Sequence, residues 1–440
     1  MNFLKNIPAW KKFPDTQTLG YYSPMGNYIC LNEYKNETEF QTALQNPTLD
    51  KNRFSVYIHE MQHYYDNVST LWGVQNLYKL FRAYDAVIKY DEYEFYKFRE
   101  VELNFKRDYF LEYYTETYSN IIGNSNDRWG FDITSGVRFS PDGKINQDLP
   151  ILFVKFSSSK KEKISRVPLS VVSLLETTAT NSEFNFLLSE ALKLESPFRE
   201  NQIKSISSKF ESLLYNPELT LYSVAVHVVS VNLQISDPIK GYEFSSLFAK
   251  IALNIPSNLF QTIKIHSEFD ITEQWKHRAK KMLENQERGF AFYLLVKNYV
   301  AVFGTDPKQM TVENILKASN LPTEQEIEKA ISEEIQALDL QILLEKNNLN
   351  SGVIDKVSWG NKFREVTGIG QQNTMTDLSK FELDKPYLIF QETYFEYENL
   401  NLETIIDKLM RQQKINIDEW FRFYTWCEKR IDSFNTICGI

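Results

Sequence analysis

The chain has 440 residues, of which 42% are hydrophobic and 24% charged, a composition typical of a soluble globular protein with a large core. Its formal net charge of −9 excludes the broad basic surface that holds nucleic acid. Three scattered cysteines, Cys30, Cys427 and Cys438, argue against a disulfide framework or a cysteine zinc site and favour a reducing cytoplasm.

The N-terminal region predicts a protein without a secretion signal that begins with a β-hairpin. Residues 1–8 contain no apolar segment of the kind that directs secretion, and no apolar run of the chain is long enough to span a membrane. We therefore expect a cytoplasmic location. Residues 21–31 surround a Ser-Pro-Met-Gly-Asn turn, which predicts two short strands.

The next segment contains the pattern His-Glu-x-x-His, at His59, Glu60 and His63. On a helix, two histidines four residues apart project from one face and can bind a single Zn²⁺, and the glutamate beside them can act as a base. Counting about 100° per residue from His59, His63 falls near 40°, and large apolar side chains gather on the opposite side. We predict one helix from Asn52 to Trp72, ended by Gly73, with a metal-binding face opposite its core face. Ordinary surface histidines are the alternative interpretation.

The following part of the chain changes from a helical to a β-type pattern. Residues 75–122 contain no proline or glycine and predict two helices that end at Gly123. Residues 136–145 and 149–156, with a turn at Pro141-Asp142-Gly143, predict strands.

A second buried helix is predicted after these strands. Residues 157–163 are rich in serine and lysine and predict a solvated loop, and the apolar residues 169–194 predict a helix. Glu176 lies in this helix, where an unpaired carboxylate would be unfavourable and a bound metal would remove the penalty. Ala179 would let the helix approach a neighbour closely.

A catalytic zinc site commonly has three protein ligands, so a third ligand is needed besides the two histidines. Glu176 is the leading candidate. Glu183 lies on the same face of the predicted helix and is the second candidate for the third ligand; if it does not bind the metal, it could hydrogen-bond a ligand. Asp66 and a remote histidine are the remaining alternatives.

The rest of the chain has an almost wholly helical pattern after Pro197. The predicted fold class is therefore α+β and predominantly helical, with a domain at residues 1–200 and a helical domain at residues 201–440. Amphipathic helices are predicted near residues 219–235, 243–253, 271–303, 323–346 and 400–435.

Two motifs together carry a family resemblance. With His59-Glu60-Met61-Gln62-His63 upstream and Leu175-Glu176-Thr177-Thr178-Ala179 downstream, residues 20–195 resemble the gluzincin type of zinc metallopeptidase. In that type the third ligand is a glutamate on a later helix. Asp66 and Ser69 replace the glycine and histidine of the metzincin motif, which excludes that class, and Thr180 stands where many gluzincins have an aspartate. The resemblance implies a zincin-like catalytic core with a small β-sheet.

The resemblance also implies a role for each matched residue. His59, His63 and Glu176 would bind Zn²⁺, and Glu60 would deprotonate the zinc-bound water and pass the proton to the leaving amine. Many members also have a residue that stabilises the oxyanion. His227 is a candidate here, although a lone histidine in an apolar run is more often a core residue. Two other histidines, His266 and His277, lie in polar contexts and are weaker candidates for this role.

These observations predict an intracellular zinc-dependent endopeptidase that acts on a protein or peptide substrate, with no nucleic acid and no membrane span. Such an enzyme must be restrained inside a cell, by a regulatory protein partner, a narrow cleft or selective recognition, as in a bacterial toxin or defence-type effector. The alternative is a non-catalytic, zinc-stabilised or metal-free helical interaction protein on a protease-like scaffold, because a fold does not establish an activity.

Overall fold

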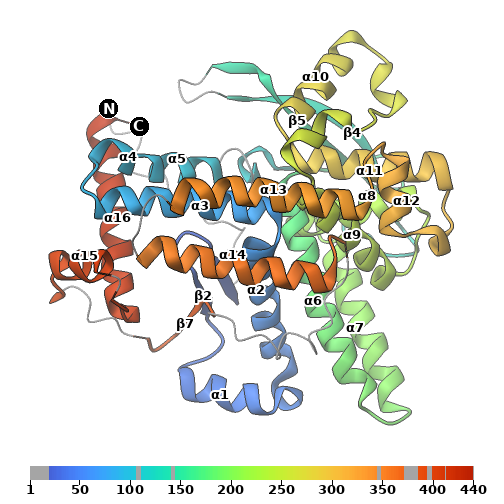
Figure 1. Cartoon of the computed structure of the whole chain (residues 1–440). Coiled ribbons are helices and arrows are strands. Elements are labelled where there is room, and N and C mark those ends of the chain that lie inside the picture. The colour runs from blue at the N-terminus through green and yellow to red at the C-terminus, as the bar shows by residue number, and fades with distance from the viewer. Residues whose placement is uncertain are drawn as a thin grey trace.

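The computed structural model describes residues 19–105, 111–139, 144–343, 348–370, 385–393, 399–411 and 413–439. In these ranges the protein is mostly helical with two small β-sheets, which confirms the predicted α+β, predominantly helical class (Figure 1). None of the described helices combines the length and the apolar character needed to cross a membrane. The predictions for residues 1–8 and for the turn at residues 141–143 lie outside the described residues.

The first sheet combines two strands from the beginning of the chain with one strand from near its end. Its strands are β1 (Gly20–Ser23), β2 (Tyr28–Leu31) and β7 (Tyr387–Phe390), in the order β1-β2-β7. The predicted hairpin is confirmed, since β1 and β2 pair antiparallel, and β2 also pairs parallel with β7 (Figure 1). As a result β1 is an edge strand of this sheet.

The second sheet is antiparallel and contains two strands that the sequence did not predict, β3 and β6. Its order is β3-β6-β5-β4. The long pair β4 and β5 confirms the predicted strands, whereas β6 begins where the predicted loop ends and buries Ile164 and Val167. The strands are β3 (Glu116–Thr117), β4 (Gly130–Phe139), β5 (Ile145–Ser157) and β6 (Lys163–Pro168).

The helix predicted from Asn52 to Trp72 is wrong at its end. Helix α2 stops at Ser69, because Thr70 is extended and its hydroxyl accepts from the backbone N–H of Gly73 to cap the next helix. Gly73 is therefore inside the first turn of α3, where a Cβ would lie 2.4 Å from the carbonyl oxygen of Asn67. The helices of this region are α1 (Glu37–Gln45), α2 (Lys51–Ser69), α3 (Leu71–Ile88), α4 (Glu92–Phe95) and α5 (Lys97–Leu103).

The prediction that residues 75–122 are helical to their end is also wrong. Helix α5 ends at Leu103, and Glu116 and Thr117 pair with Arg166 and Ser165 of β6. Residues 113–118 are rich in tyrosine and threonine, which suit a strand when a partner strand is present. The sheet therefore decides the structure of this segment.

The remaining helices confirm the helical pattern after residue 169. The predicted helix at 271–303 is divided into α10 and α11, with Gln286 in the left-handed region at φ 57°. The helices are α6 (Val171–Leu192), α7 (Phe198–Leu214), α8 (Thr220–Asn232), α9 (Pro238–Leu253), α10 (Glu273–Glu284), α11 (Arg288–Phe303), α12 (Val312–Ala318), α13 (Glu324–Leu343), α14 (Asn348–Thr367), α15 (Leu402–Met410) and α16 (Ile417–Cys438).

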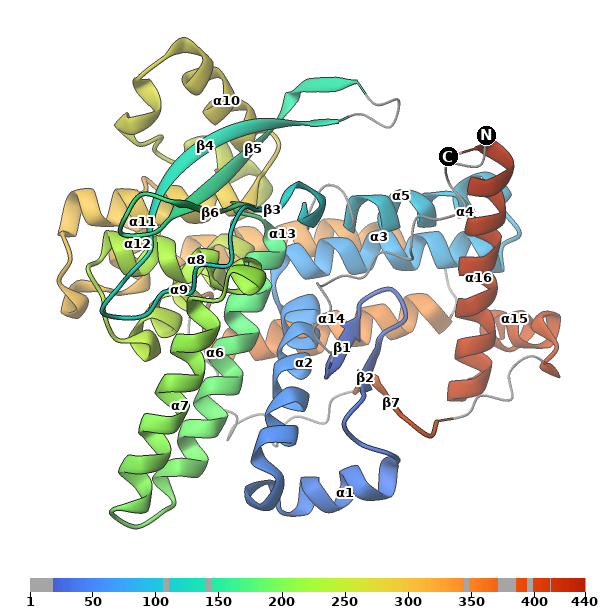
Figure 2. The ribbon, with the colours of Figure 1, turned by 180° about the vertical axis from the view of Figure 1, so that it is seen from behind.

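Helix α2 lies at the centre of the packing. It contacts α6, α3, α14 and β1, and Figure 2 shows α6 on one side of it and β1 on the other. The closest approach is at Gly360 of α14, where a Cβ would lie 1.8 Å from the carbonyl oxygen of Val68. One hydrophobic core cluster contains buried residues from both ends of the chain, from Tyr22 of β1 to Ile431 of α16. The domain boundary near residue 200 stays a prediction.

Candidate metal centre

Two histidines of α2 face helix α6. His59 and His63 are one turn apart on α2, and their rings lie 5.0 Å apart between centroids. Phe54, Tyr57 and Met61 bury the opposite side of α2 in the core, as the helical pattern predicted. The histidine face is covered as well, because α6 packs on it, and His59 is only 9% exposed.

Helix α6 brings Glu176 to the histidines. The helix begins with a capping box in which Ser170 and Ser173 satisfy each other's backbone groups. Its residues are buried on all sides, so Glu176 is a carboxylate inside an apolar helix and is 5% exposed. Ala179, one turn later, is fully buried.

Polar side chains further along hold α2 and α6 together. Thr178 donates a hydrogen bond from its hydroxyl to Asp66, and Ser182 donates one to Gln62. Gln62 in turn donates to Asp66 at 2.8 Å. These bonds occupy both carboxylate oxygens of Asp66, which does not belong to the three-residue group of His59, His63 and Glu176.

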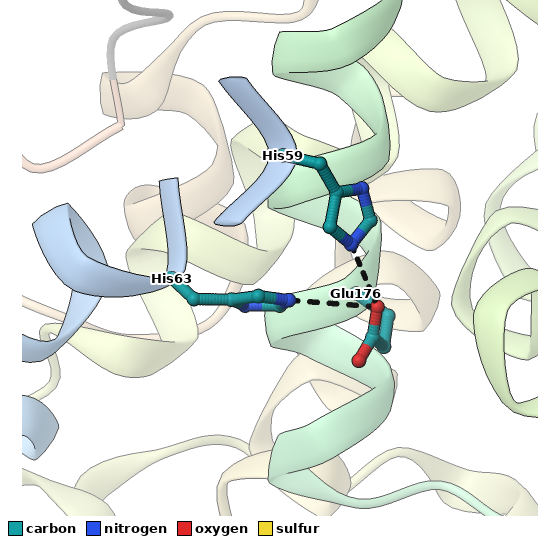
Figure 3. Close-up of side chains that lie close together, drawn as sticks. All are labelled: His59, His63 and Glu176. Carbon is teal, nitrogen blue, oxygen red and sulfur yellow. Dashed lines mark hydrogen bonds and ion pairs between the residues drawn. The ribbon is translucent and has the colours of Figure 1, made fainter. Parts of the chain in front are cut away.

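The three side chains converge on one point (Figure 3). The Nε2 atom of His59 lies 3.2 Å from Oε2 of Glu176, and Nε2 of His63 lies 3.6 Å from the same oxygen. One ligand atom from each residue lies within 4.8 Å of the other two. The structure therefore brings together the three residues that the sequence nominated as metal ligands.

The chemistry of this group fits a divalent metal. Two imidazole nitrogens and a carboxylate oxygen are donors that Zn²⁺ and similar ions accept. Burial lowers the pKa of His59, but its contacts with Glu176 and Glu183 outweigh burial and place that pKa well above its usual range. Burial likewise opposes ionisation of Glu176, yet the neighbouring histidines lower its pKa to about 2. The group thus holds a proton that a metal ion would replace.

Glu183 contacts the far side of the His59 ring. Its Oε2 lies 3.6 Å from Nδ1 of His59, while its Oε1 accepts from Ser55 at 3.1 Å and from Lys209 at 2.9 Å. Burial opposes ionisation of Glu183, but His59 and Lys209 outweigh it and lower the pKa of Glu183 to about 2. Glu183 therefore lies beside Nδ1 of His59 as an ion-pair partner beyond hydrogen-bond distance, and a hydrogen bond from a metal ligand to Glu183 stays a prediction.

Glu60 lies beside this group and is 6% exposed. Burial raises its pKa, and the nearby Glu176 carboxylate raises it further, while the two histidines and a hydrogen bond from the backbone N–H of Tyr22 act against the rise. Glu60 thus faces β1 and stays outside the three-residue group.

A cavity of about 90 Å³ contains these side chains. Its walls come from α2, from the edge strand β1, from the start of α6 and from α8. At Gly20 of β1 a Cβ would lie 2.9 Å from Val56 and 3.3 Å from Glu60, so the strand lies directly on α2. The cavity is lined by residues that include His59, Glu60, His63, Glu176, Tyr22 and Tyr222.

Tyr222 is a wall residue that the sequence did not nominate. It comes from α8, and its ring centroid lies 6.4 Å from that of His59. Burial and the nearby carboxylates of Glu176 and Glu60 place the pKa of this phenol well above its usual range, so it keeps its proton. The sequence indicated a role for Tyr222 only through its position in the same apolar helix as the candidate His227.

His227 lies in the core, away from this cavity. Its ring stacks on Trp129 and packs against Phe156 and Tyr215, and its Nε2 donates to the carbonyl oxygen of Leu214 at 2.8 Å. The candidate role of His227 at the oxyanion is therefore wrong, and the simpler expectation of a core histidine is confirmed. His266 contacts Glu268, and His277 is exposed on α10.

Acid should destabilise the protein through His227. Burial lowers its pKa to about 4, whereas an unfolded histidine titrates near 6.5. Between these two values the unfolded chain binds a proton that the folded chain does not, so stability falls as the pH falls from about 6.5 to about 4. The loss amounts to about 3 kcal/mol.

We expect urea unfolding of metal-free protein to show this loss. Between pH 7 and pH 4 the wild type should lose about 3 kcal/mol more than His227→Gln, which lacks the titrating ring. His277→Gln, the same change at an exposed position, should follow the wild type. Parallel pH curves for the wild type and His227→Gln would contradict the expectation.

Comparison of the chain with protein-family models, with curated proteins and with solved structures found no match.

Proposed function

We propose that this chain is a zinc-dependent endopeptidase. The observation that carries the proposal is that Glu60 lines the same cavity as His59, His63 and Glu176. A metal that only stabilises a fold needs no carboxylate beside its ligands, whereas hydrolysis of a peptide bond needs a base there.

The three candidate ligands suit Zn²⁺. Two histidines and one glutamate leave a position open, which is the arrangement of catalytic zinc sites. A bound Zn²⁺ would supply Lewis acidity at the scissile carbonyl and lower the pKa of a water molecule. Glu183 lies 3.6 Å from Nδ1 of His59, and with a metal bound it would accept a hydrogen bond from that nitrogen and so orient Nε2 toward the ion.

Glu60 would be the general base. It would take a proton from the attacking water and transfer it to the leaving amine. Its raised pKa suits a group that must both accept and release a proton. The hydrogen bond from the backbone N–H of Tyr22 holds the carboxylate at the wall that β1 forms.

Tyr222 would donate a hydrogen bond to the carbonyl oxygen of the scissile bond. It lines the cavity together with the ligands, and its high pKa keeps the phenol protonated. A donor aimed at an oxygen that becomes negative in the transition state stabilises that state more than the ground state.

Removal and return of zinc tests the proposal. Chelator-treated protein should cleave no peptide, and added Zn²⁺ should restore cleavage with one ion bound per chain. Peptides released from a denatured protein mixture would be identified by mass spectrometry, and the ion would be counted by elemental analysis. His63→Ala, which lacks one ligand, should bind no stoichiometric zinc and remain inactive. A wild type that stays metal-free after zinc addition would overturn the proposal.

A further inference from the structure

A second, larger cavity lies next to the candidate metal centre. Its volume is about 470 Å³, within the range of about 300–1,000 Å³ typical of ligand pockets, whereas the metal-side cavity has only about 90 Å³. A peptide held at the smaller cavity must therefore place most of its side chains elsewhere.

The two cavities share a wall. Trp72 lines both of them, and at the start of α6 Val171 lines the larger one and Val172 the smaller one. Phe105, which also lines the smaller cavity, packs edge-on against Trp72 with centroids 5.9 Å apart. The two cavities are therefore neighbours separated by the Trp72 side chain.

The larger cavity lies where α3, α11, α13 and the β4–β5 pair meet. In Figure 1, α3 and α13 run side by side, and Gln75 of α3 donates to Glu334 of α13 at 2.5 Å. Ser257 donates to the same carboxylate from its hydroxyl and its backbone N–H. These neutral donors hold Glu334 in place at one side of the cavity.

The side chains around the larger cavity carry more positive than negative charge. The cations are Lys79, Arg138 and Arg288, and the carboxylates are Glu287 and Glu334. The two arginines are 2% and 3% exposed, and Arg138 forms an ion pair with Glu287. Arg288 donates to the carbonyl oxygens of Ala252 and Ile255 and to the amide oxygen of Gln75. This local excess stands out in a chain whose net charge is −9.

Two helices also begin at this cavity. Val171 is the first residue of α6 and Arg288 the first residue of α11, and both line the cavity. The helix starts touch, since a Cβ on Gly289 would lie 1.9 Å from the carbonyl oxygen of Leu169. The partial positive charge at both helix starts adds to that of the side chains.

We propose that this cavity is the specificity subsite of the peptidase and accepts an acidic side chain of the substrate. The inference rests on the proposed peptidase function. Lys79, which is exposed on α3, is the cation of this lining that lies outside the core, whereas Arg138 and Arg288 are buried. Arg82 is exposed three residues later on the same helix, does not line the cavity and provides the matched control.

Cleavage of a peptide mixture made from a whole proteome is the first test. Zinc-loaded wild type should cut at peptide bonds that have Asp or Glu at one fixed number of residues from the scissile bond. Lys79→Glu should lower kcat/KM for such acidic peptides about tenfold, since a favourable charge contact becomes a repulsive one, and should lower it for neutral peptides much less. Arg82→Glu should match the wild type. Cleavage without any acidic preference would overturn the subsite and leave the peptidase proposal intact.

Direct binding separates the two proposals. End-blocked peptides that alternate Ala with Glu, Gln or Lys would be titrated into Glu60→Gln protein, which should not cut them. The Glu peptide should bind about tenfold more tightly than the Gln peptide, and Lys79→Glu in the same background should remove the difference. Equal binding of the Glu and Gln peptides would overturn the acidic side-chain subsite. If the wild type cleaves nothing, the peptidase proposal fails and this titration alone decides the subsite.

Discussion

Replacing Glu60 by Gln is expected to leave zinc bound and to reduce peptide cleavage by about 10²–10⁴-fold. Gln has the size and shape of Glu but cannot accept the proton. Glu60 lines the cavity without belonging to the three-residue ligand group, so its charge is not needed to hold the ion. Zinc content and cleavage rate, measured on the same preparation, check both halves of the expectation.

Glu190→Gln is a matched control for this change. Glu190 is also a buried glutamate, at 5% exposure against 6% for Glu60, but its carboxylate accepts from Thr48 and Lys193 away from the cavity. Glu190→Gln should therefore keep its cleavage rate. If Glu60→Gln kept full activity with zinc bound, the peptidase proposal would fail, and a non-catalytic interaction protein would be the better interpretation.

The ligand group could be predicted because its signals are local. The four-residue spacing of His59 and His63 puts both on one helical face whatever surrounds the helix. Glu176 was recognisable as a carboxylate in the apolar first half of its helix, a position that needs a buried partner. The structure brings these three side chains together and places Glu183 behind His59.

The walls of the cavity could not be predicted in the same way. Tyr222 comes from α8, and β1 reaches the cavity within a sheet whose third strand, β7, lies more than 350 residues along the chain from β2. Periodicity indicates that a segment is a helix or a strand and leaves its partner unspecified. Packing decides which faces meet.

The end of α2 illustrates a competition that the helical pattern alone does not resolve. Thr70 falls on the polar face of the predicted helix, and the pattern continues through Trp72. In the structure the hydroxyl of Thr70 instead donates to the carbonyl oxygen of Asp66 and accepts from the backbone N–H of Gly73. Threonine side chains can bond to the backbone in this way, and the bonds end one helix and cap the next. The resulting kink puts Trp72 between the two cavities.

Glu176→Gln is expected to weaken zinc binding far more than Glu183→Gln does. Glu176 directs a charged oxygen at both histidines, and an amide in its place removes one of three ligands and the negative charge that balances the ion. Glu183 has its own donors, Ser55 and Lys209, and acts on the site only through the His59 ring.

The two variants make the same chemical change seven residues apart on one helix, so each is the control for the other. Glu183→Gln should cost at most the ~10–100-fold in affinity that is typical of a residue hydrogen-bonded to a metal ligand, and Glu176→Gln should exceed that range. Competition with a chromophoric chelator at a fixed pH measures both affinities. The pH must be held constant, because the pKa of His59 is raised by the nearby carboxylates and zinc has to displace a proton from that histidine. A larger loss in Glu183→Gln would mean that Glu183, not Glu176, is the third ligand.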